Sequence, residues 1–445
     1  KTYINSGKKH GLYLGDQMDE ILNSSIKLLI IVDSLDKCTE GYEMLNNNGI
    51  DIIILDDHDV EINYDNYATL VSSQIQYGNS ALSGAGVTLK FLMALDEKYN
   101  TDYADKYFDL AAIGILADVS DVYESMENRA IINKGLNSLQ NPAVKKILGS
   151  YEFNSKSVLF SIAPMVNACV RTNDNELAKD FFLETNNKSL LSLKKSIELC
   201  REEQNEEKEK LLESCREQMN KQSGKVRYAF IDTKLGVSGL LGNTLVEEYQ
   251  IPVFIFNSSD DDMTIGSMRC IGYEKFKTKC NYLGIAELVG HESAAGIYIH
   301  KDDIERFIIE VNNLLENEEY IPESSTEEAD FLINYTDITK ELVENIGKIN
   351  RISGKGFKPI TFKIEGITDY TVSKFKDGKH LVLYVDNTNL MVIDWNTKFE
   401  YDGETFPEWE DHAAMNDETS VVGELESGFM GRQFRLKIIA KEIDV

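Results

Sequence analysis

Two short, nearly continuous apolar runs near the start of the chain give its clearest structural pattern. They are residues 26–32 and 50–55, both rich in β-branched side chains, and an amphipathic stretch of helical length, residues 39–46, separates them. Runs of this kind are typical of strands covered on both faces, so the pattern predicts a β-α-β unit in a parallel sheet. A helix at residues 18–22 is expected before this unit, and a third strand at residues 68–71 after it.

Both predicted strands are followed directly by acidic residues. Asp33 and Asp36 come after the first strand, and the second is followed by Asp56, Asp57, His58 and Asp59. Ligands of open parallel sheets bind beyond the carboxyl ends of the strands, so these side chains are expected to share one crevice. Carboxylates with one imidazole suit Mn²⁺ or Mg²⁺ better than a structural zinc. The alternative is that the acids only cap turns and helices, which explains one or two of them.

A third acidic point lies further along the chain. Residues 103–117 are predicted to form an amphipathic helix that ends at Asp118, with Asp121 close behind. Before it, the small residues SGAG at 83–86 open an apolar helix at 87–95. Small residues at a helix start allow close approach of a phosphate, or equally tight packing of the helix on the sheet.

The second half of the chain reads as a long helix, a second α/β unit and a β-rich end. Residues 176–225 hold charges at helical neighbour spacing, which predicts a long solvated helix between domains. An acidic linker is expected at 316–328, and the runs after it predict a small barrel of the oligonucleotide-binding (OB) kind. The strands and helices expected on either side of this linker are residues 226–231, 239–249, 253–256, 304–315, 360–364, 381–385, 390–394, 421–425 and 434–439.

This last segment carries a local excess of lysines. Lysines beside aromatic side chains are what single-strand binding requires. The alternative, of similar weight, is that the aromatics are core and the lysines merely solvated. The residues concerned are Lys355, Lys358, Lys363, Lys374, Lys376 and Lys379, with Phe357, Phe362, Tyr370 and Phe375.

Composition limits the classes of partner. The formal net charge of −29 argues against passive binding to nucleic acid or anionic membrane, so a polyanion needs a local basic surface. Six cysteines without a C-x-x-C pair favour a reduced, cytoplasmic setting. No apolar run is long enough for a membrane span, and no signal peptide opens the chain.

The ordered series of motifs resembles the DHH phosphoesterase superfamily. Asp33, Asp57-His58, SGAGV at 83–87, ILADV at 115–119 and ENR at 127–129 carry this likeness. The segment APMVNACVR at 163–171, the long helix, GSMR at 266–269, GHESAAG at 290–296 and GKGFKP at 354–359 are similar to the RecJ-type single-stranded DNA exonucleases in particular.

The resemblance implies four parts. They are a parallel-sheet DHH domain at 1–175, a connecting helix at 176–225, a smaller α/β DHH-associated domain at 226–318 and an OB-like barrel at 329–445.

The resemblance also implies roles for individual residues. Asp33, His58 and Asp118 would bind two Mn²⁺ or Mg²⁺ ions, with Asp57 as a further ligand or as the residue that orients His58. Ser267 and Arg269, expected in a turn that begins at Gly266, would hold a terminal phosphate, and Arg171 and His291 the neighbouring backbone. Asn167, Gly290, Lys374, Lys376 and Lys379 complete the expected substrate contacts. For Arg171 and Arg269 the alternative is an ion pair with a carboxylate, and for His291 a cap of its turn.

Two positions depart from the family pattern. The family's first motif, Asp-x-Asp, has no counterpart, and the opening YINSGKKHGLYL resembles the stretch that follows that motif, which is therefore expected upstream of Lys1. The third motif, Asp-His-His, reads here Asp57-His58-Asp59. An extra carboxylate beside a phosphate is unfavourable unless it binds metal or faces away.

The leading functional hypothesis is a metal-dependent exonuclease that degrades single-stranded DNA from the 5′ end in repair or recombination. Its expected partners are single-stranded DNA and, beyond it, a single-strand-binding protein or a helicase. Two alternatives stay open: a phosphodiesterase for short oligonucleotides or cyclic dinucleotides, and a RecJ-like scaffold that binds DNA or replication proteins without catalysis.

Overall fold

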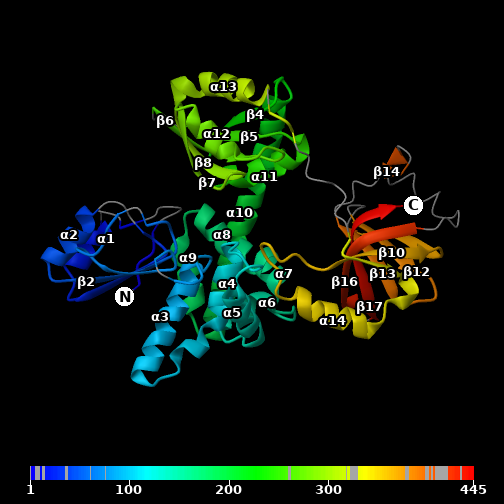
Figure 1. Ribbon diagram of the computed structural model, residues 1–445, viewed down its shortest axis with the longest axis horizontal. Helices are drawn as coiled ribbons and strands as arrows, with labels where there is room; N and C mark the ends of the chain where they lie inside the picture. The colour runs from blue at the N-terminus through cyan, green and yellow to red at the C-terminus, as the bar shows by residue number, and fades with distance from the viewer. Residues whose placement is uncertain are drawn as a thin grey trace.

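Three larger sheets are arranged around a central group of helices, and a fourth, two-stranded sheet is described in the C-terminal part (Figure 1). The computed structural model describes residues 2–5, 11–12, 16–35, 39–60, 62–75, 77–258, 262–316, 318–320, 329–375, 380–395, 400–401, 404–405, 419–430 and 433–444 of the 445-residue chain. Asp36 and most of the predicted linker lie outside these residues. No helix within the described part is long and apolar enough to cross a membrane.

The N-terminal sheet is parallel, as predicted. Strands β1 (Leu28–Val32), β2 (Asp51–Asp56) and β3 (Thr69–Ser72) lie in the order β1-β2-β3, and α2 (Glu40–Asn47) makes the crossover between the first two. α1 (Asp16–Leu22) precedes them.

One expectation about this sheet is wrong. β1 is not covered on both faces, because Leu28, Ile30 and Val32 are 47%, 46% and 43% exposed. β1 is an edge strand with one neighbouring strand, and no described residue shields this face of it.

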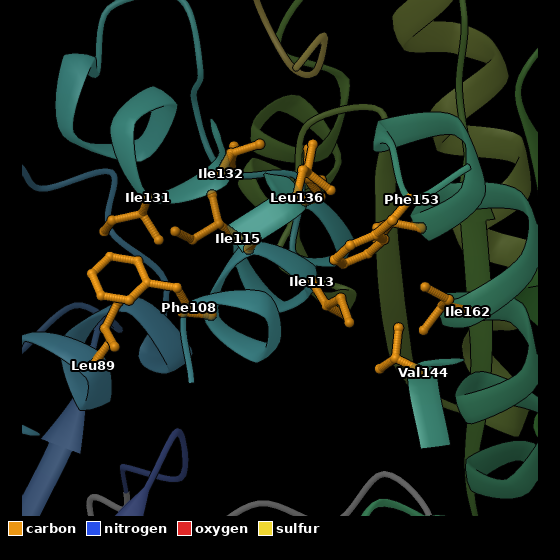
Figure 2. Packing of buried hydrophobic residues seen from close by; sticks show 14 of the residues in the cluster. Leu89, Phe108, Ile113, Ile115, Ile131, Ile132, Leu136, Val144, Phe153 and Ile162 are labelled. Carbon is orange, nitrogen blue, oxygen red and sulfur yellow. The ribbon is translucent and has the colours of Figure 1, made fainter. Parts of the chain in front are cut away.

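The main hydrophobic core lies in the helices that follow (Figure 2). The predicted amphipathic helix 103–117 is instead a short 3₁₀ turn, η1 (Tyr103–Lys106), and a separate helix, α4 (Phe108–Ala117), which is buried on most sides. This difference arises because α4 is packed between α3 and α5 and has no solvent face to keep polar. The neighbouring helices are α3 (Gly84–Tyr99), α5 (Met126–Asn137), α6 (Pro142–Leu148), α7 (Ser155–Ser157), the π-helical turn η2 (Val158–Ile162) and α8 (Ala163–Arg171).

The predicted single long helix is two helices. α9 (Asn175–Leu183) ends before Glu184, and α10 (Asn187–Met219) begins after Asn186. The Glu184 carboxylate accepts the amides of residues 185 and 186, and the Asn186 side chain accepts those of residues 188 and 189, so the break is capped on both sides. α10 then runs from the central helices to the second sheet (Figure 1).

The second sheet has five strands in the order β4-β5-β6-β8-β7, of which only β4 and β5 are parallel. The motif GSMR, expected in a turn, lies instead on strand β6, because it pairs with β5 on one side and β8 on the other. The elements are β4 (Arg227–Ile231), α11 (Ser238–Tyr249), β5 (Val253–Asn257), β6 (Met263–Arg269), α12 (Phe276–Tyr282), β7 (Ala286–Gly290), β8 (Ala294–His300), η3 (Lys301–Asp303) and α13 (Ile304–Glu316).

The C-terminal part is a seven-stranded mixed sheet in the order β11-β12-β13-β17-β16-β10-β9. The expected barrel is not formed by the described strands, since β11 and β9 end the sheet without pairing to each other. Sequence analysis missed β9, β11 and the helix α14, which packs on β16. The elements are β9 (Phe331–Asn334), η4 (Tyr335–Asp337), α14 (Lys340–Asn350), β10 (Thr361–Ile367), β11 (Tyr370–Phe375), β12 (His380–Val385), β13 (Leu390–Trp395), β16 (Thr419–Met430) and β17 (Gln433–Asp444), with a small hairpin of β14 (Glu400–Tyr401) and β15 (Glu404–Thr405).

A group of polar contacts joins this sheet to the central helices. The Arg351 guanidinium donates to the carbonyl oxygens of Leu136 and Phe153 at 2.6 and 3.1 Å. The hydroxyls of Ser155 and Ser353 are 3.0 Å apart, and Lys156 forms an ion pair with Glu424 at 2.7 Å. The C-terminal part is thereby fixed against the helical core.

Candidate metal centre and anion pocket

Three predicted ligands meet at the carboxyl ends of β1 and β2. Asp33, Asp57 and His58 each offer a ligand atom, and these atoms lie within 4.8 Å of one another. Asp33 follows the last residue of β1, and Asp57 and His58 follow the last residue of β2. Asp59 is exposed and lies outside this cluster of ligand atoms.

Asp33 is held in an uncommon conformation. Its φ is 52°, in the left-handed region, while its amide still donates to the carbonyl oxygen of Leu55 at 2.9 Å. A Cβ at Gly84, the first residue of α3, would lie 2.8 Å from the Asp33 Cβ and 3.0 Å from its Oδ1. The glycine at the start of α3 therefore makes room for a candidate ligand. Of the two explanations for the small residues at 83–86, tight packing at the helix start accounts for Gly84.

His58 is oriented by Asp56. The His58 Nδ1 and its backbone amide both lie 2.8 Å from Asp56 Oδ1, and Asp56 is fully buried. The described side-chain hydrogen bond to His58 therefore comes from Asp56, whereas Asp57 was the residue considered for this contact. The sequence signal was available, because Asp56 ends a buried strand and lies two residues before the histidine.

Electrostatics within the cluster shift two pKa values strongly. Burial raises the pKa of Asp57 to about 6, and the negative charges of Asp33 and Asp118 add to this rise. The hydrogen bond to Asp56 raises the pKa of His58 to about 9, although burial opposes it. Burial alone would raise the pKa of Asp56, but the hydrogen bonds from His58 and Leu35 bring it below its ordinary value.

Asp118 approaches the same crevice from the end of α4. Partial removal from water and the charge of Asp33 raise its pKa, while the Ser120 hydroxyl, which donates to its Oδ2 at 3.1 Å, and the charge of His58 oppose the rise. The next residue, Val119, has a φ of 56°, which is rare for a β-branched side chain. Strained backbone at both Asp33 and Val119 is typical of functional sites.

His291 connects this crevice to the second sheet. It lies in the tight turn between β7 and β8, and its charge lowers the pKa of Asp118. Its amide donates to the carbonyl oxygen of Ala294 at 3.0 Å, so the backbone forms the turn while the exposed ring is close enough to Asp118 for electrostatic interaction. Gly290, which precedes it, has a φ of 130° and is also exposed.

Arg171 and Arg269 lie close enough for their charges to interact, and neither has an acidic partner among the described residues. Burial and the charge of Arg269 lower the pKa of Arg171, and burial lowers that of Arg269. Neither guanidinium has a carboxylate oxygen within 4.0 Å in the part of the chain that the structure describes. Arg171 donates to the Gln204 side chain at 3.3 Å, and Arg269 to Asn243 and to the carbonyl oxygen of Met268. The described contacts thus do not bear out the ion-pair alternative for these arginines.

Hydroxyls and small residues lie beside Arg269, and together with Arg171 they make up a candidate anion site, the anion pocket. The hydroxyls of Ser267 and Ser238 are 2.8 Å apart, and Ser238 begins α11. A Cβ at Gly239 would lie 2.6 Å from Arg269 Nη2 and 3.7 Å from Ser267 Oγ. Ser238, Asn243 and Gly239 were missed from the sequence, because their approach to Arg269 depends on the packing of α11 against β6.

No described contact links the other predicted substrate-binding residues to this pocket. Asn167 is exposed on α8, one turn before Arg171. Lys376 and Lys379 lie outside the described residues, and for Lys374 only its backbone on β11 is described. Phe362 is buried and Tyr370 accepts a hydrogen bond from Thr419, as expected for core aromatics. The basic track therefore stays a prediction.

The donor set of the strand-end cluster fits a divalent cation. Two carboxylates and one imidazole within 4.8 Å offer the oxygen-rich, one-nitrogen environment that suits Mn²⁺, and Mg²⁺ by its carboxylates. The five described cysteines are free, and none of them belongs to the cluster. The chemistry of the residues thus agrees with the metals expected from the sequence.

The chain is similar in sequence to known proteins. Residues 2–115 match the DHH family, N-terminal domain. A prophage protein of Bacillus subtilis (strain 168), named as a single-strand DNA-specific exonuclease, YorK, is 29% identical over an alignment of 388 residues that covers 76% of this chain. The chain spans 64% of the length of that relative.

Solved structures show the same fold. The crystal structure of RecJ in complex with Mn²⁺ from Thermus thermophilus has a TM-score of 0.73 at 19% identity, covering 97% of this chain and 63% of that one. The complex of the same protein with Mg²⁺ gives 0.67 at 18% identity, covering 94% and 61%. The agreement extends over nearly the whole described architecture.

Proposed function

We propose that this chain, whose residues 2–115 match the DHH family, N-terminal domain, is a metal-dependent phosphoesterase that removes nucleotides from the 5′ end of single-stranded DNA. The observation that carries the proposal is the pair of arginines with no carboxylate partner among the described residues, in the same chain as a strand-end cluster of Asp33, Asp57 and His58. The first feature is suited to a phosphate and the second to divalent ions. YorK and RecJ, named as exonucleases of single-stranded DNA, support this substrate class.

Each residue has a distinct task in this proposal. Asp33, Asp57, His58 and Asp118 hold two Mn²⁺ or Mg²⁺ ions, which when bound supply an activated water and stabilise the leaving oxygen. Arg269 and Ser267 hold the terminal phosphate, and Arg269 is suited to this by its planar guanidinium. Arg171 and His291 bind the neighbouring backbone phosphate, while Asn167 and Gly290 border the same path.

The proposed division of labour follows the four segments expected from the sequence. Residues 1–175 form the catalytic domain, 176–225 the connection, 226–318 the phosphate-binding domain and 329–445 the part that binds longer strands through Lys374, Lys376 and Lys379. A single-strand-binding protein or a helicase is the proposed partner, and repair or recombination the proposed setting. A cytoplasmic location remains a prediction from the cysteine pattern.

The catalytic proposal is favoured over a non-catalytic scaffold by the convergence of the ligands. Asp33 and Val119 both adopt left-handed backbone conformations beside candidate ligands. Such strain costs free energy and persists where the surrounding structure enforces it. A non-catalytic scaffold would not require these strained backbone conformations.

Digestion of end-labelled single strands by the full-length protein with Mn²⁺ tests the proposal. We expect mononucleotides to be released from 5′-phosphorylated strands, more slowly from 5′-hydroxyl strands, and none after removal of the metal by chelation. Asp33→Ala and Asp118→Ala should each abolish release while the protein stays folded. Unchanged turnover in either variant, or release from the 3′ end, would contradict the assignment.

A further inference from the structure

We propose that Asp56 is a positioning residue of the metal centre, which holds His58 so that its Nε2 is the nitrogen offered to the metal. This inference rests on the proposed function, because it deepens the role of the same site. The resemblance to known families gave Asp56 no role, and the side chain does not itself enter the cluster of ligand atoms.

The geometry around Asp56 carries the inference. Its Oδ1 accepts from the His58 amide and contacts His58 Nδ1, both at 2.8 Å, and its Oδ2 accepts from the amide of Leu35 at 2.9 Å. Leu35 lies two residues after Asp33. A single carboxylate thus ties together the two loops that bear the candidate ligands, one after β1 and one after β2.

The bond to His58 also decides which ring nitrogen carries the proton: Nδ1, which lies 2.8 Å from Asp56 Oδ1 and 3.9 Å from Asp33 Oδ1. An ionised carboxylate only accepts hydrogen bonds, so His58 must place a proton on Nδ1 to satisfy Asp56. The lone pair of a neutral ring then resides on Nε2. Because Asp56 is fully buried, water does not compete for its oxygens. Carboxylates that orient a metal-binding histidine in this way typically contribute ten- to a hundredfold, as an order of magnitude, to metal affinity.

Asp56→Asn is the discriminating substitution, because an amide has one acceptor oxygen and a donor in place of the second. If the oxygen of the new amide faces His58, its NH₂ group faces the Leu35 amide, and two donors oppose each other. If the amide is turned the other way, its NH₂ group donates toward His58 Nδ1 and favours the tautomer with the proton on Nε2. We expect the Mn²⁺ dissociation constant of the full-length protein, measured by electron paramagnetic resonance, to rise roughly ten- to a hundredfold.

Asp109→Asn is the matched control. Asp109 is equally buried and also accepts three hydrogen bonds, from the amides of Leu110, Gln140 and Asn141, but it lies among the central helices. This variant should lose thermal stability without a change in Mn²⁺ affinity. Equal affinity of the Asp56→Asn and wild-type proteins would overturn the positioning role. Absence of Mn²⁺ binding by the wild-type protein would overturn the metal centre itself.

A second measurement applies even where Asp56→Asn fails to fold. In wild-type protein labelled with ¹⁵N-histidine and loaded with diamagnetic Cd²⁺, long-range ¹H–¹⁵N correlations report the proton on each ring nitrogen. The His58 signals are assigned by their loss in His58→Gln. We expect the proton on Nδ1 and the metal-induced shift on Nε2. A proton on Nε2 would overturn the inference.

Discussion

Single side chains decide the chemistry of this molecule, and two of them stand out. Arg269 is a half-buried cation in a chain of net charge −29, yet it contacts an amide and a carbonyl oxygen and no carboxylate among the described residues. The surroundings of His58 are the opposite of those of Arg269, because carboxylates surround its ring and Asp56 accepts a hydrogen bond from it. In the proposed function the first residue binds an anion and the second a cation.

Arg269→Ala should weaken binding of 5′-phosphorylated strands about ten- to a hundredfold, because a charged hydrogen bond contributes about 1.5–3 kcal/mol. Strands with a 5′ hydroxyl should be nearly unaffected, since they offer no terminal phosphate. Fluorescence anisotropy with the two oligonucleotides and without metal measures the difference.

Arg216→Ala provides the comparison for that substitution. Arg216 forms an ion pair with Glu248 at 2.9 Å and joins α10 to α11 away from the anion pocket. It should leave both affinities unchanged. If Arg269→Ala impairs both strand ends alike, the arginine positions the domain rather than the phosphate.

Binding of the Mn²⁺ ion that His58 holds should release close to one proton per protein molecule at pH 7.5. The pKa of His58 near 9 keeps the ring protonated before metal binds, whereas Asp57, with a pKa near 6, is already ionised. The ion must displace the His58 proton, so affinity rises with pH up to about 9 and falls steeply below pH 6, where Asp57 also gains a proton. Calorimetry in buffers of different ionisation enthalpy counts the protons. In His58→Gln the release at pH 7.5 should disappear, and its persistence would assign the proton to another group.

The candidate metal centre and the anion pocket both lie where a strand, or the end of a strand, meets the start of a helix. β1 and β2 end at the candidate metal ligands, and α3 begins with a glycine against Asp33. In the second sheet, α11 begins with Ser238 and Gly239 against β6. In both places a small residue at the start of a helix allows a polar side chain of a strand or its end to pass close to the helix.

Gly239→Ala should reduce the preference for 5′-phosphorylated strands. The added Cβ would lie 2.6 Å from Arg269 Nη2 and would force the guanidinium to move. Gly347→Ala in α14 is the matched substitution, because nothing lies within 4 Å of its added Cβ. That variant should gain up to about 1 kcal/mol in free energy of unfolding and keep the preference. A Gly239→Ala protein with unchanged end preference would show that the pocket is wider than its contacts indicate.

The whole molecule couples its C-terminal part to the candidate metal centre through one loop. The carbonyl oxygen of Lys355 accepts from the Val122 amide at 3.0 Å, and Gly356 lies against Tyr123. These partners follow Asp118 and Ser120 on the loop after α4. Segments more than 200 residues apart in sequence therefore support the same ligand-bearing loop, and the motif GKGFKP has a structural role beside the proposed nuclease site.

Gly356→Ala should lower Mn²⁺ affinity as well as stability. Its φ of 76° disfavours a side chain, and the added Cβ would lie 2.8 Å from Tyr123 Cβ. Gly284→Ala has the backbone effect without the steric contact, because its φ of 65° also disfavours a side chain but its added Cβ meets nothing within 4 Å. Both variants should lose about 1–2 kcal/mol in free energy of unfolding. Only Gly356→Ala should weaken Mn²⁺ binding, and equal affinities in the two variants would argue that the loop does not support Asp118.

The sequence by itself determined the features that depend on short-range patterns. Apolar runs identified β1, β2 and the strands β4 and β5, and the acids after β1 and β2 identified candidate ligands, because strand direction and alternation are encoded locally. It also indicated the resemblance to the DHH phosphoesterases, and residues 2–115 match the DHH family, N-terminal domain. The roles of the site residues remain predictions that the experiments above test.

Tertiary structure decided what depends on distant packing. The break between α9 and α10, the burial of α4 and the open C-terminal sheet follow from neighbours that no local pattern reveals. The same holds for the choice of Asp56 rather than Asp57 beside His58, and for Ser238 beside Ser267. A hydrogen bond requires angles and distances within a few tenths of an ångström, and only the assembled fold fixes these.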